Sequence, residues 1–130
     1  MESLLVIDDE PDLLAGLQLA FSSSGYKVYT ATNAEAGFRF MESYRPVAVL
    51  LDYKLTCADG MEFLDWTKGR KPGTPIILMT GDGPLLDSIE ETSRKMGIYA
   101  CLRKPFRVEE ALDLIREALE KRSSPPPEGV

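Results

Sequence analysis

The sequence predicts an α/β fold in which helices cover both faces of a doubly wound, five-stranded parallel sheet, a (βα)5 arrangement. Two observations carry this prediction. Five short apolar runs alternate with five segments of helical period along the 130 residues, and such an alternation is typical of a parallel sheet with helical crossovers. The third run, Val47–Leu51, is apolar at every position, as expected of a strand that is covered on both faces.

The apolar runs are the predicted strands. In chain order they are Leu4–Ile7, Lys27–Thr30, Val47–Leu51, Ile76–Met79 and Tyr99–Leu102. Ligands of open parallel sheets bind beyond the carboxyl ends of the strands, so the residues that follow each run form the candidate site.

The first two predicted helices cover about Pro11–Ser24 and Asn33–Ser43. The proline that opens the first helix suits a first turn, because no helical hydrogen bond is lost there, and Gly25 is a typical stop. Thr32 and Glu35 have the spacing of a capping box at the start of the second helix.

Three further helices are predicted in the second half of the chain. The third begins near Asp59 and Gly60, the fourth runs from about Pro84 to Gly97, and the fifth covers about Arg107–Arg122. Residues 1–122 are therefore expected to form one domain. Residues 123–130, with the sequence SSPPPEGV, are expected to be a disordered tail or the start of a linker.

The composition excludes several classes of function. A net charge of −6 provides no electrostatic surface for nucleic acid, and no stretch has the length of a membrane span. Cys57 and Cys101 form no C-x-x-C pair, as expected of reduced thiols in a cytoplasmic protein. The absence of histidine excludes histidine-dependent nucleophilic sites, histidine-ligated zinc and a role as histidine phosphodonor.

Charged and polar side chains gather at the predicted strand ends. They are Asp8, Asp9 and Glu10 after the first strand, Asp52 after the third, Thr80 and Gly81 after the fourth, and Lys104 after the fifth. Two like charges about 4 Å apart repel by about 4 kcal/mol in a protein-like dielectric, so the aspartates require a cation or must protonate. The available ligands are oxygens, which favours Mg²⁺ over zinc or copper.

These groups match the needs of phosphoryl transfer, which requires an aligned nucleophile and fixed positive charge on the transferred oxygens. Asp52 is ionised at neutral pH and needs no general base. Mg²⁺ and Lys104 supply charge, the Thr80 hydroxyl can donate a hydrogen bond, and Gly81 leaves the approach open.

The set Asp8-Asp9, Asp52 within LLDYKLTCADG, Thr80-Gly81 and Lys104-Pro105-Phe106 resembles the receiver domain of two-component response regulators over residues 2–121. The resemblance implies the flavodoxin-like strand order 2-1-3-4-5 and a cis peptide bond before the proline. It implies that Asp52 is the phosphoacceptor and that Thr80 and Lys104 contact the phosphoryl group. It further implies that Mg²⁺ is bound directly by Asp9, Asp52 and the backbone carbonyl of Lys54, and largely through water by Asp8.

The resemblance also implies the partners. A sensor histidine kinase or a phosphotransfer protein would donate the phosphoryl group from a phosphohistidine. The fourth helix, fifth strand and fifth helix would then contact an output partner or effector domain. Such a domain is not an enzyme, since it promotes only its own phosphorylation and dephosphorylation.

Three departures from the family pattern bear on function. Thr56 stands where proline is common, and Lys54 and Asp82 occupy the variable positions that flank the site, where they are candidate modulators of water access. Cys101 replaces the aromatic residue that commonly reports the phosphorylated state. We expect Tyr99 to point to the same face of the fifth strand as Cys101, two residues later.

Three other interpretations stay open on the sequence alone. A receiver-like interaction module that is never phosphorylated would keep the fold without the chemistry. A flavodoxin-like nucleotide or flavin binder would need a glycine-rich phosphate turn in place of the acidic first turn. An aspartate-based phosphatase would be expected to carry D-x-D, whereas the two aspartates here are adjacent.

Overall fold

The computed structural model describes residues 2–55, 74–81 and 98–123. Its elements, in chain order, are β1 (Ser3–Ile7), α1 (Pro11–Ser23), β2 (Lys27–Ala31), α2 (Ala34–Tyr44), β3 (Ala48–Asp52), the single turn α3 (Tyr53–Leu55), β4 (Ile76–Thr80), β5 (Ala100–Arg103) and α6 (Val108–Ser123). The predicted third and fourth helices lie outside the described residues, as do Thr56, Cys57, Asp82 and residues 124–130.

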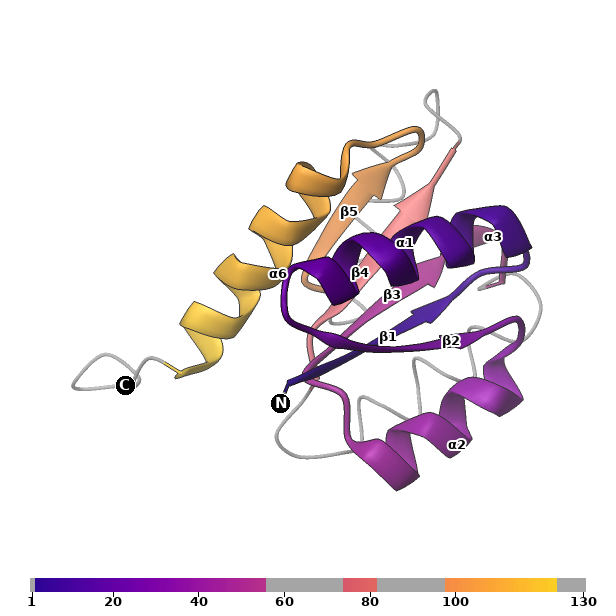
Figure 1. Ribbon diagram of the computed structural model, residues 1–130, viewed down its shortest axis with the longest axis horizontal. Helices are drawn as coiled ribbons and strands as arrows, with labels where there is room; N and C mark the ends of the chain where they lie inside the picture. The colour runs from indigo at the N-terminus through magenta and orange to yellow at the C-terminus, as the bar shows by residue number, and fades with distance from the viewer. Residues whose placement is uncertain (1, 56–73, 82–97, 124–130) are drawn as a thin grey trace.

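The strands form one sheet of five parallel strands in the order β2-β1-β3-β4-β5 (Figure 1). This finding confirms the predicted fold class and the strand order that the resemblance implies. Every residue of β1, β3 and β4 is buried, as expected of strands that are covered on both faces. The outer strands β2 and β5 include exposed positions.

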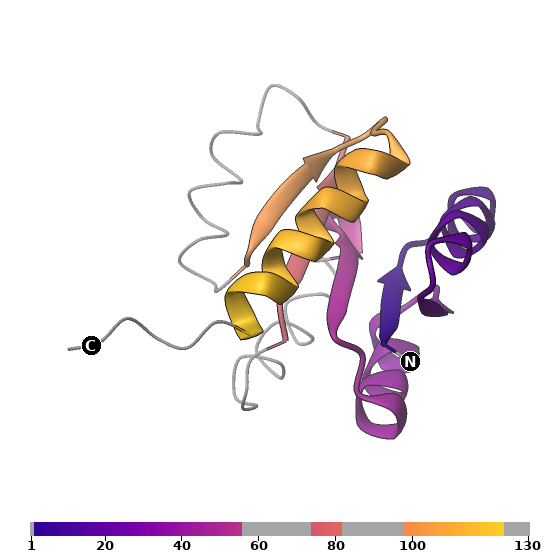
Figure 2. The ribbon, with the colours of Figure 1, turned by 60° about the vertical axis from the view of Figure 1, so that its left-hand side comes forward.

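Helices α1 and α6 cover one face of the sheet and α2 covers the other (Figures 1 and 2). Successive side chains of a strand point to opposite faces, so Leu4 and Val6 of β1 join the core cluster under α1 and α6, whereas Leu5 and Ile7 join the cluster under α2. Within the described residues, none of the helices is both long and apolar enough to cross a membrane.

The ends of the first two helices agree with the sequence analysis in part. Pro11 opens α1, and Gly25 follows its last turn with φ 96°, a conformation that glycine adopts without steric cost. The predicted capping box is wrong: Asn33 caps α2, its side-chain oxygen accepting a hydrogen bond of 2.9 Å from the backbone N–H of Ala36. Glu35 instead forms an ion pair with Arg39 one turn later. The box assigns the Glu35 N–H to threonine, whereas the helix begins one residue later and the asparagine oxygen accepts from the Ala36 N–H. Asparagine is at least as good a cap as threonine.

The expected orientation of Tyr99 is also wrong. Tyr99 packs against the cluster under α1 and α6, where the Lys121 Nζ atom lies 5.4 Å from its ring centroid. Cys101 packs against the cluster on the opposite face. The regular strand begins at Ala100, so side-chain alternation within β5 does not extend back to Tyr99.

Candidate functional site

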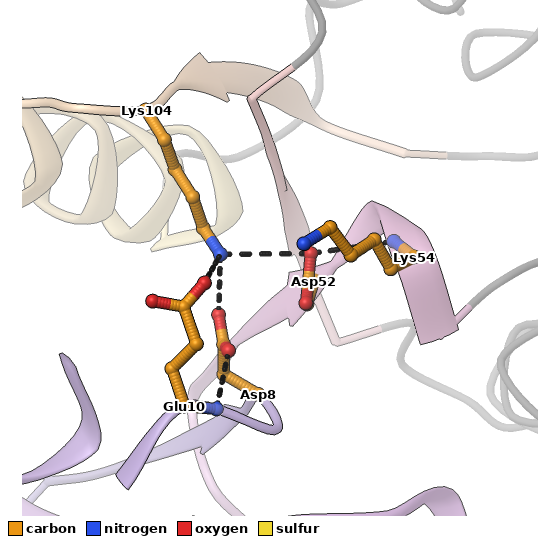
Figure 3. Close-up of polar contacts among 5 residues, drawn as sticks. All are labelled: Asp8, Glu10, Asp52, Lys54 and Lys104. Atoms are coloured by element: carbon orange, nitrogen blue, oxygen red, sulfur yellow. Dashed lines mark hydrogen bonds and ion pairs between the residues drawn. The ribbon is translucent and has the colours of Figure 1, made fainter. Parts of the chain in front are cut away.

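The carboxyl ends of β1, β3, β4 and β5 bring the predicted site residues to one edge of the sheet. Asp8 follows β1 directly, Asp52 and Thr80 are the last residues of β3 and β4, and Lys104 follows β5. Asp8, Asp52 and Thr80 are buried. Figure 3 shows the Lys104 side chain reaching from the end of β5 toward carboxylates of β3 and of the β1–α1 turn.

The Lys104 ammonium is the centre of the described polar contacts. Its Nζ atom donates a hydrogen bond of 2.7 Å to Asp8 Oδ2 and lies 3.6 Å from both Asp52 Oδ1 and Glu10 Oε1. Burial opposes its charge, but the Asp8 hydrogen bond and the neighbouring carboxylates outweigh burial and raise the pKa of Lys104. The Lys104 backbone N–H donates a hydrogen bond of 2.7 Å to the Thr80 carbonyl oxygen, which fixes the start of this side chain beside β4.

Asp52 has one carboxylate oxygen with a partner and one without. Oδ1 accepts a hydrogen bond of 3.3 Å from the Lys54 backbone N–H, in addition to its contact with Lys104. Oδ2 is buried and has no hydrogen-bond partner in the described parts of the chain. Burial, followed by the charge of Asp8, raises the pKa of Asp52, and the charge of Lys104 and the Lys54 N–H act in the opposite direction. Asp52 is therefore a buried carboxylate that further positive charge would stabilise.

The turn after β1 offers the oxygen ligands of a hard cation. One carboxylate oxygen from each of Asp8, Asp9 and Glu10 lies within 4.8 Å of the other two. Asp8 is buried, whereas Asp9 and Glu10 are exposed. Oxygen ligands of this kind suit Mg²⁺. Asp52 Oδ2, which lacks a partner in the part of the chain that the structure describes, is a further ligand that such an ion could satisfy. Glu10 belongs to this group although the sequence analysis gave it no role.

Four further residues of the predicted site lie within the described part of the chain. Thr80 ends β4 at the same edge, and Gly81 is exposed, with no atom within 4 Å of an added Cβ. The described residues therefore leave room for a larger side chain than glycine at position 81. The exposed Lys54 lies beside Asp52, and its predicted partner Asp82 lies outside the described residues. Cys101 is half-buried against the core cluster under α2.

A cleft of about 580 Å³ gives access to this edge. Among the described residues, its walls include the polar groups Glu10, Asp52 and Lys104 and the apolar side chains Leu13, Leu17 and Phe106. The peptide bond between Lys104 and Pro105 is cis, as the resemblance implies.

Comparisons with known proteins agree on one family. The family model described as the response regulator receiver domain matches residues 4–116. The transcriptional regulatory protein GlrR of Escherichia coli (strain K12) is 32% identical over 118 residues, which cover 91% of this chain and 26% of GlrR. Sporulation initiation phosphotransferase F of Bacillus subtilis (strain 168) is 32% identical over 123 residues, which cover 95% of this chain and 98% of that protein. A receiver domain structure from Clostridium thermocellum aligns with a TM-score of 0.82 and 30% identity, over 94% of this chain and 97% of that structure.

The electrostatics of Asp52 predict that Asp52→Asn stabilises the metal-free protein. The unfolding free energy at pH 7 should rise by about 1 to 2 kcal/mol, because the variant removes a buried charge, one oxygen of which has no partner within residues 2–55, 74–81 and 98–123. The raised pKa means that the folded state binds the proton more tightly than the unfolded chain. The charge therefore costs stability at pH values above the unfolded pKa, and the gain should vanish toward about pH 4.

Urea unfolding with a metal chelator present measures this effect. Glu2→Gln, which removes a charge from an exposed residue, is the control and should change the unfolding free energy by less than about 0.5 kcal/mol. A variant Asp52→Asn that is no more stable than the wild type at pH 7 contradicts the prediction.

The ion pair between Lys104 and Asp8 predicts the opposite effect for Lys104→Met. The variant should still fold but lose about 3 kcal/mol in metal-free urea unfolding, because the buried Asp8 carboxylate is left without its ammonium partner. Arg103→Met is the matched control, since Arg103 is the preceding cation and is exposed. Equal losses in the two variants would show that Lys104 does not hold the carboxylates together.

Proposed function

We propose that this chain, which belongs to the response regulator receiver family, accepts a phosphoryl group on Asp52. The observation that carries the proposal is the state of Asp52, a buried carboxylate beside an ammonium and an open cleft, with one oxygen that has no partner among the described residues. A carboxylate of this kind is a nucleophile that needs no general base. The chemistry uses groups that the described residues bring to one sheet edge.

In the proposed transfer, an Asp52 oxygen forms a bond to phosphorus while the bond between phosphorus and the leaving atom of the donor breaks. Lys104 lies close enough to pair with an oxygen of the transferred group, and the Thr80 hydroxyl at the end of β4 would donate a hydrogen bond to another. Receiver domains generally use Mg²⁺ at their acidic site. Here Asp9, Asp52 and the Lys54 carbonyl would hold it, with Asp8 acting largely through water, and it would supply positive charge to the transferred oxygens.

These 130 residues contain no histidine, so a phosphohistidine donor would have to lie outside them. We infer a sensor histidine kinase or a phosphotransfer protein in this role, since the chain belongs to the response regulator receiver family. β5, α6 and the predicted fourth helix would form the surface for an output partner. The boundaries 1–122 for the domain and 123–130 for a tail, the modulating roles of Lys54 and Asp82, the atypical switch position Cys101 and a cytoplasmic location belong to the same proposal.

Phosphorylation at Asp52 is tested with a small donor. Incubation with acetyl phosphate and Mg²⁺ should add one phosphoryl group to the intact protein, because the site itself supplies the nucleophile and the charge. Intact mass spectrometry measures the addition. Asp52→Asn and a chelator should each abolish it, whereas Glu2→Gln should not change it.

Addition that persists in Asp52→Asn would falsify the assignment of the acceptor. A wild-type protein that binds Mg²⁺ but takes up no phosphoryl group would favour the alternative of a receiver-like interaction module.

The acidic cluster predicts that Mg²⁺ stabilises the fold. At about ten times its dissociation constant, Mg²⁺ should raise the unfolding free energy by about 1.4 kcal/mol, because it relieves repulsion among the carboxylates. Thermal unfolding over millimolar Mg²⁺ measures the effect. Asp9→Ala should remove the stabilisation, Asp8→Ala should reduce it, and Asp12→Asn should retain it. A wild-type melting temperature that does not respond to Mg²⁺ contradicts the assigned metal site.

A further inference from the structure

Glu10 contacts the ammonium that the proposed chemistry requires. Its Oε1 atom lies 3.6 Å from Lys104 Nζ, the same distance as Asp52 Oδ1. The Glu10 side chain is 55% exposed, whereas the Asp52 side chain is 2% exposed. In Figure 3 the Glu10 and Asp52 carboxylates approach the ammonium from different sides. The two carboxylates therefore compete for one positive charge.

The position of Glu10 leaves its carboxylate available for this contact. Glu10 is the residue before the first turn of α1, and its side chain makes no capping hydrogen bond with that helix. Its backbone N–H donates a hydrogen bond of 2.9 Å to Asp8 Oδ1. The same aspartate thus anchors both the Glu10 backbone and, through Oδ2, the Lys104 ammonium.

We propose that Glu10 is a positioning residue that competes with Asp52 for the Lys104 ammonium and thereby weakens the binding of a phosphoryl group at the site. The inference rests on the proposed function. An ammonium has three donors, and in the unmodified protein Asp8, Glu10 and Asp52 lie around them. A phosphoryl group on Asp52 adds oxygens that compete for the same ammonium. The exposed Glu10 is the partner that Lys104 can give up at least cost, because water can solvate the released carboxylate.

The inference predicts that Glu10→Gln tightens the binding of a phosphoryl mimic. Exposed ion pairs are weak, so the affinity for beryllofluoride should rise by about two- to fivefold. Titration calorimetry of the full chain at saturating Mg²⁺ measures the affinity, which separates this effect from any loss of metal affinity at the acidic cluster. Asp12→Asn is the control for charge alone, because it removes the same charge from a residue of the same cleft.

A second measurement tests whether Glu10 acts through Lys104. The unfolding free energies of Glu10→Gln, Lys104→Met and the double variant form a double-mutant cycle. The inference requires a favourable coupling between the two positions in metal-free buffer, so Glu10→Gln should destabilise the wild type more than it destabilises Lys104→Met.

The inference stands if Glu10→Gln tightens beryllofluoride binding more than Asp12→Asn does and if the cycle shows coupling. It is overturned if the two variants bind alike, if Glu10→Gln binds more weakly than the wild type, or if the coupling is absent. Binding by the wild type separates the two possible failures. A wild-type protein that binds no beryllofluoride overturns the proposed function and this inference together, whereas a wild type that binds it with no difference between the variants overturns this inference alone.

Discussion

The crowding of carboxylates at one end of the sheet is the constraint on which the rest of this site depends. β1 and β3 are neighbours and end together, so Asp8 and Asp52 are buried at the same edge, where the charge of Asp8 raises the pKa of Asp52. Lys104 relieves part of this repulsion by contacting both. Its place depends on β5, which pairs with β4 and is tied to it again by the hydrogen bond from the Lys104 N–H to the Thr80 carbonyl. The edge strand β5 is thus coupled to the central strands through the charge of Lys104 as well as through the backbone hydrogen bonds between strands.

Most of the described fold could be predicted because the hydrophobic pattern is strong. The uninterrupted apolar run that forms most of β3 leaves a strand buried on both faces as the simplest solution. The strand order, in contrast, came from family resemblance, since nothing in the apolar runs themselves states which strands are neighbours. The errors were local. Asn33 and Thr32 are both good helix caps, and only the backbone conformation decides between them. The orientation of Tyr99 depends on where β5 begins, and strand boundaries are the least reliable part of a sequence-based prediction.

The site was predictable for a related reason. Parallel strands end at the same edge, so polar residues after apolar runs had to converge there, and Asp8, Asp52, Thr80 and Lys104 do. Glu10 was missed because an acidic residue before a helix has an adequate local explanation in the helix dipole. A signal was nevertheless present, since three consecutive acidic residues in one turn exceed what a single helix start needs. The contact with Lys104 joins residues that are 94 positions apart in the chain, and no local pattern reports a contact of that kind.

The cleft beside Asp52 also affects how long a phosphorylated state would last. An acyl phosphate is a mixed anhydride, and water hydrolyses it wherever water can reach the phosphorus atom. The cleft through which a phosphodonor would reach Asp52, with Glu10 and Lys54 among the residues around it, is wide enough to admit water as well. Enzymes that protect such intermediates do so by excluding solvent. Under the proposed function, the modified state therefore has a finite lifetime that the protein itself sets. The side chains around the cleft would set the rate at which the acyl phosphate is hydrolysed. Their replacement would change how long a signal persists without changing which residue carries the phosphoryl group.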